Sequence, residues 1–425
     1  MVIGIDASRA NKPHKSGTEW YAYYLIRGLA RLDDKNEYIL YTDQPLQAGL
    51  LDLTCDKHEI SEDEKIKFDN HGCQIIKSRH NNFKAKVLNW PFKFLWTQGR
   101  LSLEMLFHSP DLLFIPAHVL PVIHPKKSVV TIHDIGFKQT EKLYSEEMIV
   151  PMDSVKNRFF NFLIKIFTLG KHSGSKLDYL QWSTQYALKK AKQIITISKF
   201  SKKELLNNYK VKADKIKIVY NGYNNSLYRK IDNEIKTNAV LKKYGIVQPF
   251  IFYVGRLGKK KNTDKLIEAY AIMRQKHPEI NHRLCLAGDA SFGYDEIKYQ
   301  VSEFGLSNRV IMPGWVEEGD MPYIFNAASA FIFPSNYEGF GIPLLQAMAC
   351  GTPVTASNTS SIPEIAKNAA LFFDQDDVYD MAKKIAEIIQ NNKKRKELIK
   401  LGFERIKNFS WQKCAQDTLN LLNSL

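Results

Sequence analysis

The segment Ala330–Ala356 reads A-F-I-F-P-S-N-Y-E-G-F-G-I-P-L-L-Q-A-M-A-C-G-T-P-V-T-A. It begins and ends with short apolar runs, Ala330–Phe333 and Pro353–Ala356, which are typical of buried strands. Between them lie a glycine-containing loop and an apolar helical run that includes Pro343, and proline is favoured at a first helical position. A strand, a helix and a second strand in succession predict a crossover unit with parallel strands.

The same alternation of strand-like and helix-length segments extends over most of the chain, which indicates parallel sheets. The other candidate strands are Val2–Ile5, Tyr38–Tyr41, Leu112–Ile115, Val129–Ile132, Gln193–Ile197, Ile216–Val219, Phe250–Val254, Arg283–Ala287 and Val310–Met312. They form two series within 425 residues. The pattern therefore predicts an α/β protein with two Rossmann-like, doubly wound domains that face each other across a cleft.

The first series ends at Asn221–Gly222, and both residues tolerate turn geometry. We therefore expect one domain over residues 1–222 and a second over residues 223–400. Residues 401–425 are expected to form a helix that packs back towards the first domain.

Composition excludes several classes of protein. Hydrophobic residues make up 44% and charged residues 25% of the chain, so disordered and fibrous classes are excluded. The five cysteines contain no CxxC pair, which disfavours a structural zinc site or a disulfide framework and fits a reducing cytosol. No run approaches the roughly 20 apolar residues of a membrane span, and the first residues resemble a strand rather than a signal peptide. We expect a cytoplasmic protein, peripheral at most on the inner face of the cell membrane.

The net charge of +15 favours an acidic partner, which is nucleic acid, an anionic membrane or a phosphorylated small molecule. Residues 1–222 carry +11 of this charge and residues 223–425 carry +4. Most of the excess therefore lies on the first predicted domain.

Ligands of open α/β sheets bind at the carboxyl ends of strands, so the loops after the strands are the candidate sites. After Phe333 come Glu338, Gly339 and Gly341, and Gln346 lies in the first turns of the following helix. The glycines allow close approach of a ligand, and the amides of the helix amino terminus favour an anion. A tight strand–helix turn explains the glycines but not the carboxylate and the amide that flank them.

Arg256 and Lys261 lie in the loop after the strand Phe250–Val254. Alone, this loop reads as a solvated surface loop. Arginine offers a planar fork for phosphate and lysine a mobile point charge, and each charge-assisted hydrogen bond contributes about 1.5–3 kcal/mol. Together with the loop after Phe333, these two residues predict a diphosphate site that needs no metal.

His133 follows the strand Val129–Ile132. An isolated histidine is usually structural, but at the carboxyl end of a strand it is also a candidate sugar-hydroxyl ligand or proton acceptor. The chain contains no HExxH, Walker or GxSxG motif, which disfavours the corresponding metalloprotease, nucleotidase and hydrolase chemistries.

These residues belong to an ordered set of motifs that resembles the retaining glycosyltransferases of family 4, which have the two-domain GT-B architecture. The motifs are T-I-H-D-I-G-F (Thr131–Phe137), T-I-S-K-F-S-K (Thr196–Lys202), V-Y-N-G (Val219–Gly222), V-G-R-L-G-K-K-K-N (Val254–Asn262), P-G-W-V (Pro313–Val316), F-P-S-N-Y-E-G-F-G-I-P-L-L-Q-A-M-A-C-G-T-P-V (Phe333–Val354), S-N-T-S-S-I-P-E (Ser357–Glu364) and F-S-W (Phe409–Trp411). Any one of them is modest evidence, but their order is highly specific.

The resemblance implies a nucleotide-sugar donor held mainly by the second domain, and a glycan or lipid-linked acceptor bound mainly by the first. It implies no metal, no cofactor and retention of anomeric configuration by same-face attack. By matching position, the catalytic candidates are His133 and Glu338. The implied donor contacts are Gly17, Ser198, Arg256, Lys261, Pro313, Gly314, Glu338, Gly339, Phe340, Gly341, Ile342 and Gln346.

Two positions depart from the family pattern. Gln346 stands where the family has a second glutamate, so an amide replaces the carboxylate expected to meet the ribose. Gly17 stands alone where the family has a glycine pair. The segment Ser357–Glu364 resembles bacterial polysaccharide mannosyltransferases, so GDP-mannose is the first expected donor, followed by UDP-sugars and dTDP-rhamnose.

Residues 153–182 hold an apolar helical pattern with basic flanks. One interpretation is buried packing. The other is a helix in the bilayer interface, where each basic residue adds roughly 1 kcal/mol near anionic lipid. A lipid-linked acceptor agrees with the second interpretation, so the excess charge favours an anionic membrane surface over nucleic acid.

The leading hypothesis is a retaining hexosyltransferase that builds a surface polysaccharide or glycolipid. A second hypothesis is another GT-B enzyme, such as a nucleotide-sugar epimerase or a phosphorylase. A third is a non-catalytic protein that binds membranes or nucleic acid through its basic face.

Overall fold

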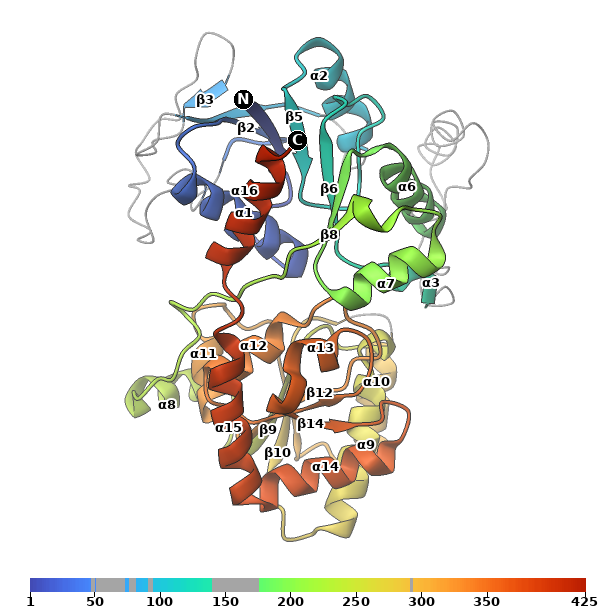
Figure 1. Ribbon diagram of the computed structural model, residues 1–425. Coiled ribbons are helices and arrows are strands. Elements are labelled where there is room, and N and C mark those ends of the chain that lie inside the picture. Colours follow the sequence, from blue (N-terminus) through green and yellow to red (C-terminus); the bar gives the residue numbers. More distant parts are fainter. Residues whose placement is uncertain (47–49, 51–72, 76–81, 91–94, 140–175, 291–292) are drawn as a thin grey trace. The chain divides into compact units, whose positions relative to one another are not determined.

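The computed structural model describes residues 1–46, 50, 73–75, 82–90, 95–139, 176–290 and 293–425 (Figure 1). The chain divides into two compact units. Unit 1 contains Met1–Asn221 and Trp411–Leu425, and unit 2 contains Gly222–Ser410. The predicted interfacial helix of residues 153–182 lies outside the described residues except for its last seven positions.

The described part of unit 1 forms a sheet of eight strands in the order β3-β4-β2-β1-β5-β6-β7-β8. The strands are β1 (Val2–Asp6), β2 (Glu37–Thr42), β3 (Cys73–Ile75), β4 (Phe83–Val87), β5 (Leu112–Ile115), β6 (Ser128–Ile132), β7 (Gln193–Thr196) and β8 (Ile216–Ile218). Only β3, at one edge, is antiparallel to its neighbour among these strands. The strand order reverses between β1 and β5.

The described helices of unit 1 are α1 (Gly17–Leu32), α2 (Ser102–Phe107), α3 (Gly136–Gln139), α6 (Lys176–Lys190), α7 (Lys199–Asn208) and α16 (Trp411–Asn423), with a π-helical turn at Thr97–Leu101 and a 3₁₀ turn at Ala213–Lys215. The core between helices and sheet consists of buried aliphatic residues, among them Leu113, Ile115, Val130, Ile132 and Ile194. Burial of such side chains is the main favourable contribution to folding.

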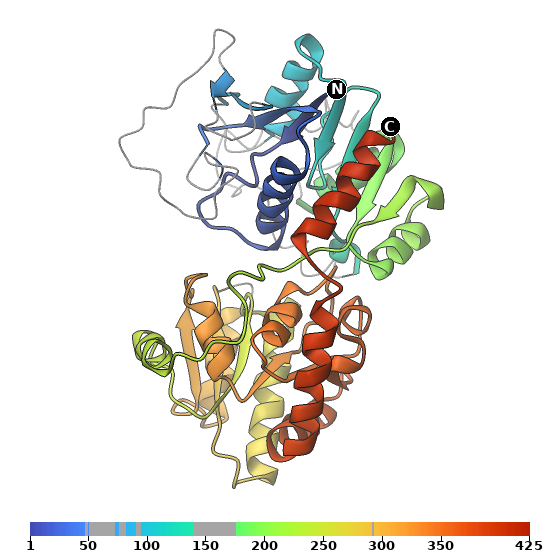
Figure 2. The ribbon, with the colours of Figure 1, turned by 60° about the vertical axis from the view of Figure 1, so that its left-hand side comes forward.

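Helix α16 packs along α1, although about 380 residues separate them in the chain (Figures 1 and 2). The Trp411 ring stacks on Tyr24 with 5.2 Å between ring centroids. A Cβ atom at Gly28 would lie only 2.5 Å from the Cβ of Ala415, so the absence of a side chain at Gly28 lets the two helices approach.

The described part of unit 2 forms a fully parallel sheet of six strands in the order β11-β10-β9-β12-β13-β14. The strands are β9 (Phe250–Val254), β10 (Arg283–Ala287), β11 (Val310–Gly314), β12 (Ala330–Phe333), β13 (Val354–Ser357) and β14 (Ala370–Phe373). The order reverses between β9 and β12, which is the switch point of a doubly wound sheet.

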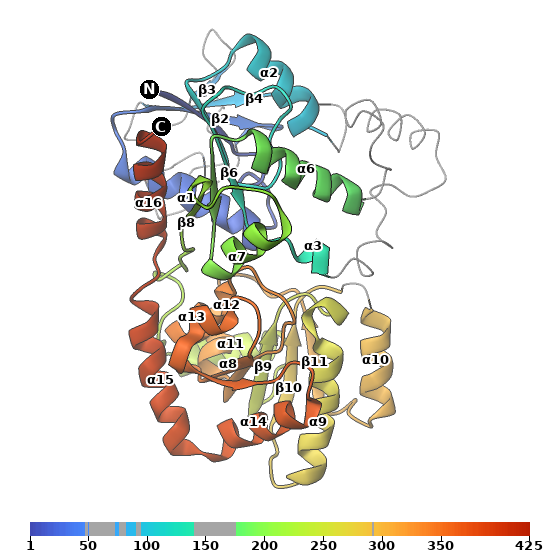
Figure 3. The ribbon, with the colours of Figure 1, turned by 45° about the vertical axis from the view of Figure 1, so that its right-hand side comes forward.

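The helices of unit 2 cover both faces of this sheet (Figure 3). They are α8 (Glu234–Lys243), α9 (Thr263–Lys276), α10 (Tyr294–Glu303), α11 (Met321–Ala327), α12 (Ile342–Ala349), α13 (Ile362–Ala366), α14 (Val378–Gln390) and α15 (Asn392–Ile406), with 3₁₀ turns at Lys259–Lys261 and Lys367–Ala369. Helix α9 packs against α10 and α14, and α12 packs against α11 and α15.

The two doubly wound sheets confirm the predicted fold class. The structure differs from the expected boundary at residue 400, because α15 runs through that position as one helix. Gly402 on α15 lies against Met348 of α12, since a Cβ there would be 3.2 Å from the Met348 Cγ. The chain therefore stays in unit 2 until Ser410 and returns to unit 1 at Trp411.

We predict that Gly28→Ala destabilises the protein by about 1–3 kcal/mol, because the new methyl group overpacks the contact between α1 and α16. Ala415→Gly in the same chain removes the opposing methyl group. In a double-mutant cycle measured by urea unfolding, the cost of Gly28→Ala should fall by about 1 kcal/mol or more in the Ala415→Gly background. An equal cost in both backgrounds would contradict the assigned contact.

Candidate functional site

The switch point of unit 2 brings two glycine-containing loops together. Strands β9 and β12 pair directly, with Ala330 opposite Ile251. The loop after β9 contains Arg256 and Lys261, and the loop after β12 contains Glu338. The crevice outside the carboxyl ends of strands at such a reversal is where open α/β sheets bind ligands.

An ion pair joins these two loops. The Lys261 Nζ lies 2.6 Å from the Glu338 Oε1, and both side chains are partly accessible to solvent. The Arg256 side chain is exposed and forms no ion pair with any described residue. The two loops therefore carry two cations and one carboxylate at the carboxyl edge of the sheet, residue types suited to a diphosphate with polar substituents.

Tyr253 supports the loop that carries Arg256. Its hydroxyl donates to the Arg256 carbonyl oxygen at 3.0 Å. Burial, together with the charge of Glu338, raises the pKa of Tyr253 well above its ordinary value of 10.0, so the phenol stays protonated as a donor.

Two further residues shape the same loop, and neither is among the predicted site residues. Asn262 adopts a left-handed conformation (φ 60°), and its side-chain amide donates to the Gln375 carbonyl oxygen at 2.9 Å. Gly288, after β10, has φ +133°, and a Cβ there would lie 2.0 Å from the Gly255 carbonyl oxygen. Only glycine fits there, because the two loops touch through their backbones.

The backbone of Glu338 is held by the loop after β13. Its amide donates to the Ser360 Oγ at 3.1 Å, and its carbonyl oxygen accepts from the Ser361 Oγ at 2.9 Å. These bonds fix the main chain of Glu338, while its carboxylate faces Lys261.

Helix α12 begins at Ile342 after Gly341, whose φ of +93° explains the need for glycine. The Phe340 ring is buried against Phe409, with 5.7 Å between ring centroids, so only its backbone is available to a ligand. Gly339 is buried and Gln346 is half-buried on α12.

Pro313 and Gly314 end strand β11, and both are half-buried. The Gly314 carbonyl oxygen accepts from the Gly288 amide at 2.8 Å, which ties the ends of β10 and β11 together. Trp315 follows directly and is 45% exposed, so a large aromatic side chain lies next to these predicted donor contacts.

In unit 1 His133 follows β6 and is buried. Its Nε2 lies 3.0 Å from the Pro116 carbonyl oxygen, and the Tyr21 ring meets its ring edge-on at 4.7 Å. Burial lowers the pKa of His133 below its ordinary value of 6.5, so the imidazole is neutral near pH 7.

The Ser198 side chain has a role inside unit 1. Its hydroxyl caps α7, accepting from the Ser201 amide at 3.0 Å and donating to the Ser201 Oγ at 3.0 Å. The side chain is fully buried. Because the Ser201 hydroxyl in turn donates to the His133 carbonyl oxygen at 3.0 Å, Ser198 is linked through Ser201 to the His133 loop.

Gly17 is the first residue of α1, and a Cβ there would meet nothing within 4 Å. The Ser16 amide and hydroxyl both bind the Glu19 Oε2 in a capping box. Burial opposes ionisation of Glu19, but the Ser16 hydroxyl and the Arg9 charge outweigh it and lower the pKa of this carboxyl. A carboxylate thus occupies the amino terminus of α1, which makes phosphate binding at Gly17 less favourable than the sequence suggests.

Within the described ranges there is no cluster of His, Cys, Asp and Glu able to hold a metal. No helix among the described residues is long and apolar enough to cross a membrane.

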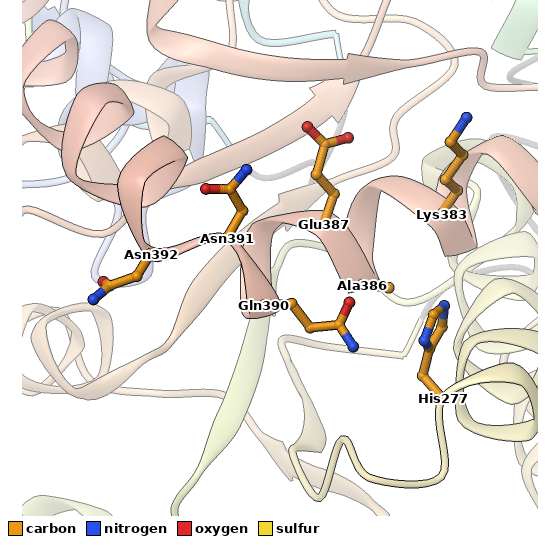
Figure 4. Close-up of a pocket in the computed structure, with 7 residues that line it drawn as sticks. All are labelled: His277, Lys383, Ala386, Glu387, Gln390, Asn391 and Asn392. Atoms are coloured by element: carbon orange, nitrogen blue, oxygen red, sulfur yellow. The ribbon is translucent and has the colours of Figure 1, made fainter.

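A separate polar hollow lies at the end of α9 and α14, lined by His277, Lys383, Ala386, Glu387, Gln390, Asn391 and Asn392 (Figure 4). Both helices follow strands, so these carboxyl-terminal ends lie at the amino end of the sheet, away from the switch-point loops. The hollow contains none of the predicted site residues.

Two family models match the chain in succession. The model described as Glycosyltransferase Family 4 matches residues 15–227, half of the chain. The model described as Glycosyl transferases group 1 matches residues 239–405.

Two relatives are bacterial mannosyltransferases. The O-antigen chain mannosyltransferase B of Escherichia coli is 32% identical over 260 residues, which are 60% of this chain and 67% of that protein. A serotype-specific mannosyltransferase of Escherichia coli is 27% identical over 233 residues, which are 53% of this chain and 28% of that protein.

Solved structures show the same fold. The sucrose-phosphate synthase from Thermosynechococcus elongatus aligns over 100% of this chain and 98% of its own, with a TM-score of 0.69 and 17% identity. The Anabaena HepE structure with UDP and glucose aligns over 100% of this chain and 99% of its own, with a TM-score of 0.66 and 20% identity. With the family models, these results confirm the resemblance that the motifs predicted: the chain belongs to glycosyltransferase family 4.

Proposed function

We propose that this protein is a retaining, metal-independent hexosyltransferase that moves mannose from GDP-mannose to a growing surface polysaccharide or a lipid-linked glycan. The observation that carries this proposal is the Lys261–Glu338 ion pair across the switch point, with the exposed Arg256 in the same loop as Lys261. The choice of mannose follows the two mannosyltransferase relatives.

The proposed chemistry follows from the charges. Arg256 and Lys261 bind the donor diphosphate and stabilise the negative charge that develops as the bond between the anomeric carbon and the phosphate oxygen breaks. The acceptor hydroxyl forms the new bond to the anomeric carbon from the same face, and its proton goes to the departing diphosphate.

Glu338 changes partner when the donor binds. In the structure its carboxylate oxygen lies 2.6 Å from the Lys261 ammonium. The diphosphate competes for the Lys261 ammonium, so the carboxylate becomes available to accept hydrogen bonds from hydroxyl groups of the sugar. His133, held neutral in unit 1, serves as a further ligand of the transferred sugar.

We also propose that the protein acts at the cytoplasmic face of an anionic membrane, and the described part of unit 1 offers a surface for this. Leu103, Leu106 and Phe107 on α2 are 47%, 56% and 72% exposed. The Val122 amide donates to the Ser102 Oγ at 3.1 Å, which brings the exposed Ile123 next to α2.

Lysines flank this apolar surface. Lys126 and Lys127 are exposed. The Leu113 amide, at the start of β5, donates to the Lys127 carbonyl oxygen at 2.9 Å. Because β5 is the next element after α2, this bond brings the two lysines near the end of α2. Lys192 lies beside them, since its amide donates to the Ser128 carbonyl oxygen at 2.8 Å. Exposed apolar side chains flanked by lysines suit an anionic bilayer surface better than nucleic acid.

Donor binding can be tested by thermal unfolding with GDP-mannose, UDP-glucose and dTDP-rhamnose. A ligand at 100 times its Kd stabilises the folded state by about 2.7 kcal/mol, and we expect this effect for GDP-mannose. Lys261→Met should weaken binding by about tenfold to 150-fold, because one charge-assisted bond to phosphate is lost. The control Lys265→Met removes an exposed ion pair with Asp376 and should leave binding unchanged. Stabilisation by no nucleotide sugar would refute the proposal.

Gln346→Glu restores the acid that the family pattern has at this position. A carboxylate can accept from both ribose hydroxyls, so we expect donor affinity, measured by calorimetry, to be kept or improved. Complete loss of donor binding would show that Gln346 does not meet the ribose.

Membrane attachment can be tested by cosedimentation with vesicles of phosphatidylglycerol and phosphatidylcholine at low and high salt. The protein should bind at low salt, and Leu106→Ser with Phe107→Ser should reduce binding by about tenfold or more, because two apolar side chains are lost from the interface. Ile235→Ser, which removes an 87% exposed apolar side chain from α8 in unit 2, should bind normally. Normal binding by the double variant would rule out the α2 surface.

A further inference from the structure

His118 lies beside His133 at the carboxyl edge of the unit 1 sheet. His118 follows β5 and His133 follows β6, and these strands pair in parallel with Ile115 opposite Val130. The two imidazole rings stack with 5.6 Å between centroids and 16° between planes. His118 is not among the residues that the sequence motifs single out.

Two hydrogen bonds define the proton positions on both rings. The His133 backbone amide donates to the His118 Nε2 at 3.0 Å, so this nitrogen carries no proton and the His118 proton is on Nδ1. The His133 Nε2 lies 3.0 Å from the Pro116 carbonyl oxygen, which only accepts, so the His133 proton is on Nε2. The His133 Nδ1 is then an acceptor.

The short segment Pro116–His118 therefore holds His133 at two points, its ring and its amide. A third group of His133, its carbonyl oxygen, accepts a hydrogen bond from the Ser201 hydroxyl at 3.0 Å. The Tyr21 ring packs edge-on against His133, and the Tyr21 hydroxyl lies 3.1 Å from the Thr131 Oγ1. Together these contacts fix both the orientation and the tautomer of His133.

The charged groups around the pair are Arg9, Glu19 and Asp134. Burial lowers the pKa of His118 to about 4, aided by His133 and Arg9 and opposed by Asp134. Burial also lowers the pKa of His133, while Pro116, Asp134 and Glu19 oppose the shift. Both rings are neutral at physiological pH, so His133 can accept a hydrogen bond but cannot act as a cation.

We propose that His118 is a positioning residue: its Nε2 holds the His133 backbone amide, which keeps the ring at the Pro116 carbonyl oxygen as the Nε2–H tautomer, so that the His133 Nδ1 accepts a hydrogen bond from a hydroxyl group of the bound sugar. This role rests on the proposed function, since it concerns the same reaction. It assigns to the segment after β5 a part in orienting the sugar.

The test uses the full-length protein labelled with ¹⁵N-histidine. Imidazole nitrogen shifts at about pH 7.5 should show the Nε2–H tautomer for His133, since both rings are neutral there. His118→Gln keeps an acceptor near the position of Nε2 and should preserve this spectrum. His118→Leu leaves the His133 backbone amide without this acceptor, so the ring should lose its fixed place at the Pro116 carbonyl oxygen and mixed tautomers should appear.

Activity gives the second measurement. His118→Leu should lower kcat by about tenfold to a hundredfold with little change in donor KM, because a misplaced His133 affects the reacting geometry more than ground-state binding. His118→Gln should restore most of kcat. The control His124→Leu removes a half-buried histidine that contacts a backbone carbonyl elsewhere in unit 1, and it should leave kcat unchanged.

The pH dependence of stability gives the third. The pKa of His118 is about 4 in the folded state and near 6.5 in the unfolded state. As pH falls, the unfolded protein therefore binds a proton at His118 before the folded protein does. The contribution of His118 to stability is therefore complete above pH 6.5 and is lost as pH falls towards 4. His118→Gln should show a shallower loss over that range.

The outcomes separate the two proposals. An unchanged His133 tautomer and unchanged kcat in His118→Leu, or equal damage in His118→Gln and His118→Leu, would overturn the role of His118 while donor binding still supports the proposed function. A fixed tautomer in a protein that binds no nucleotide sugar would overturn the proposed function, and with it this role in catalysis.

Discussion

The Lys261 ammonium and the Glu338 carboxylate approach to 2.6 Å although 77 residues separate them in the chain. This contact depends on one topological constraint, the direct pairing of β9 with β12 at the reversal of strand order. Parallel pairing puts the loops after both strands at the same edge of the sheet. The backbone contact between Gly255 and Gly288 then holds the next loop of that edge in place.

The ion pair also determines the charge that the site offers. Glu338 neutralises the charge of Lys261. Of these three residues, Arg256 is therefore the cation that forms no ion pair with any described residue. The ion pair keeps the Lys261 ammonium at the switch point, where the proposed donor diphosphate would exchange one oxygen ligand for another.

Much of the fold and part of the site could be predicted from the sequence. Strands of four or five apolar residues are recognisable by their pattern. The glycines after Phe333 predicted a loop there, and the structure shows that Gly341 has a φ of +93°, a conformation that favours glycine. The motif resemblance placed Ser198 among the donor contacts, and in the structure its own helix uses the hydroxyl as a cap. At such positions a local hydrogen bond competes with ligand binding, and spacing alone does not show which one prevails.

The supporting residues could not be predicted for a different reason. Nothing in the spacing of His118 and His133 shows that a ring nitrogen of one meets the backbone amide of the other, because that contact depends on the register of β5 against β6. The same holds for Tyr253, whose hydroxyl binds a carbonyl three residues later only because of the turn at Gly255. Residues that hold a site act through tertiary geometry, which a single sequence does not display.

The return of the chain to unit 1 at Trp411 has a consequence for biosynthesis. Helix α16 buries Trp411, Leu419 and Leu422 in unit 1, which otherwise ends at Asn221. A ribosome releases residues in order from the amino terminus, and domains generally fold as units during synthesis. Unit 2, which is continuous from Gly222 to Ser410, can complete its core while unit 1 still exposes the face of α1 that α16 covers in the folded protein. Of the two units, unit 1 therefore starts earlier in the chain but completes its core after unit 2.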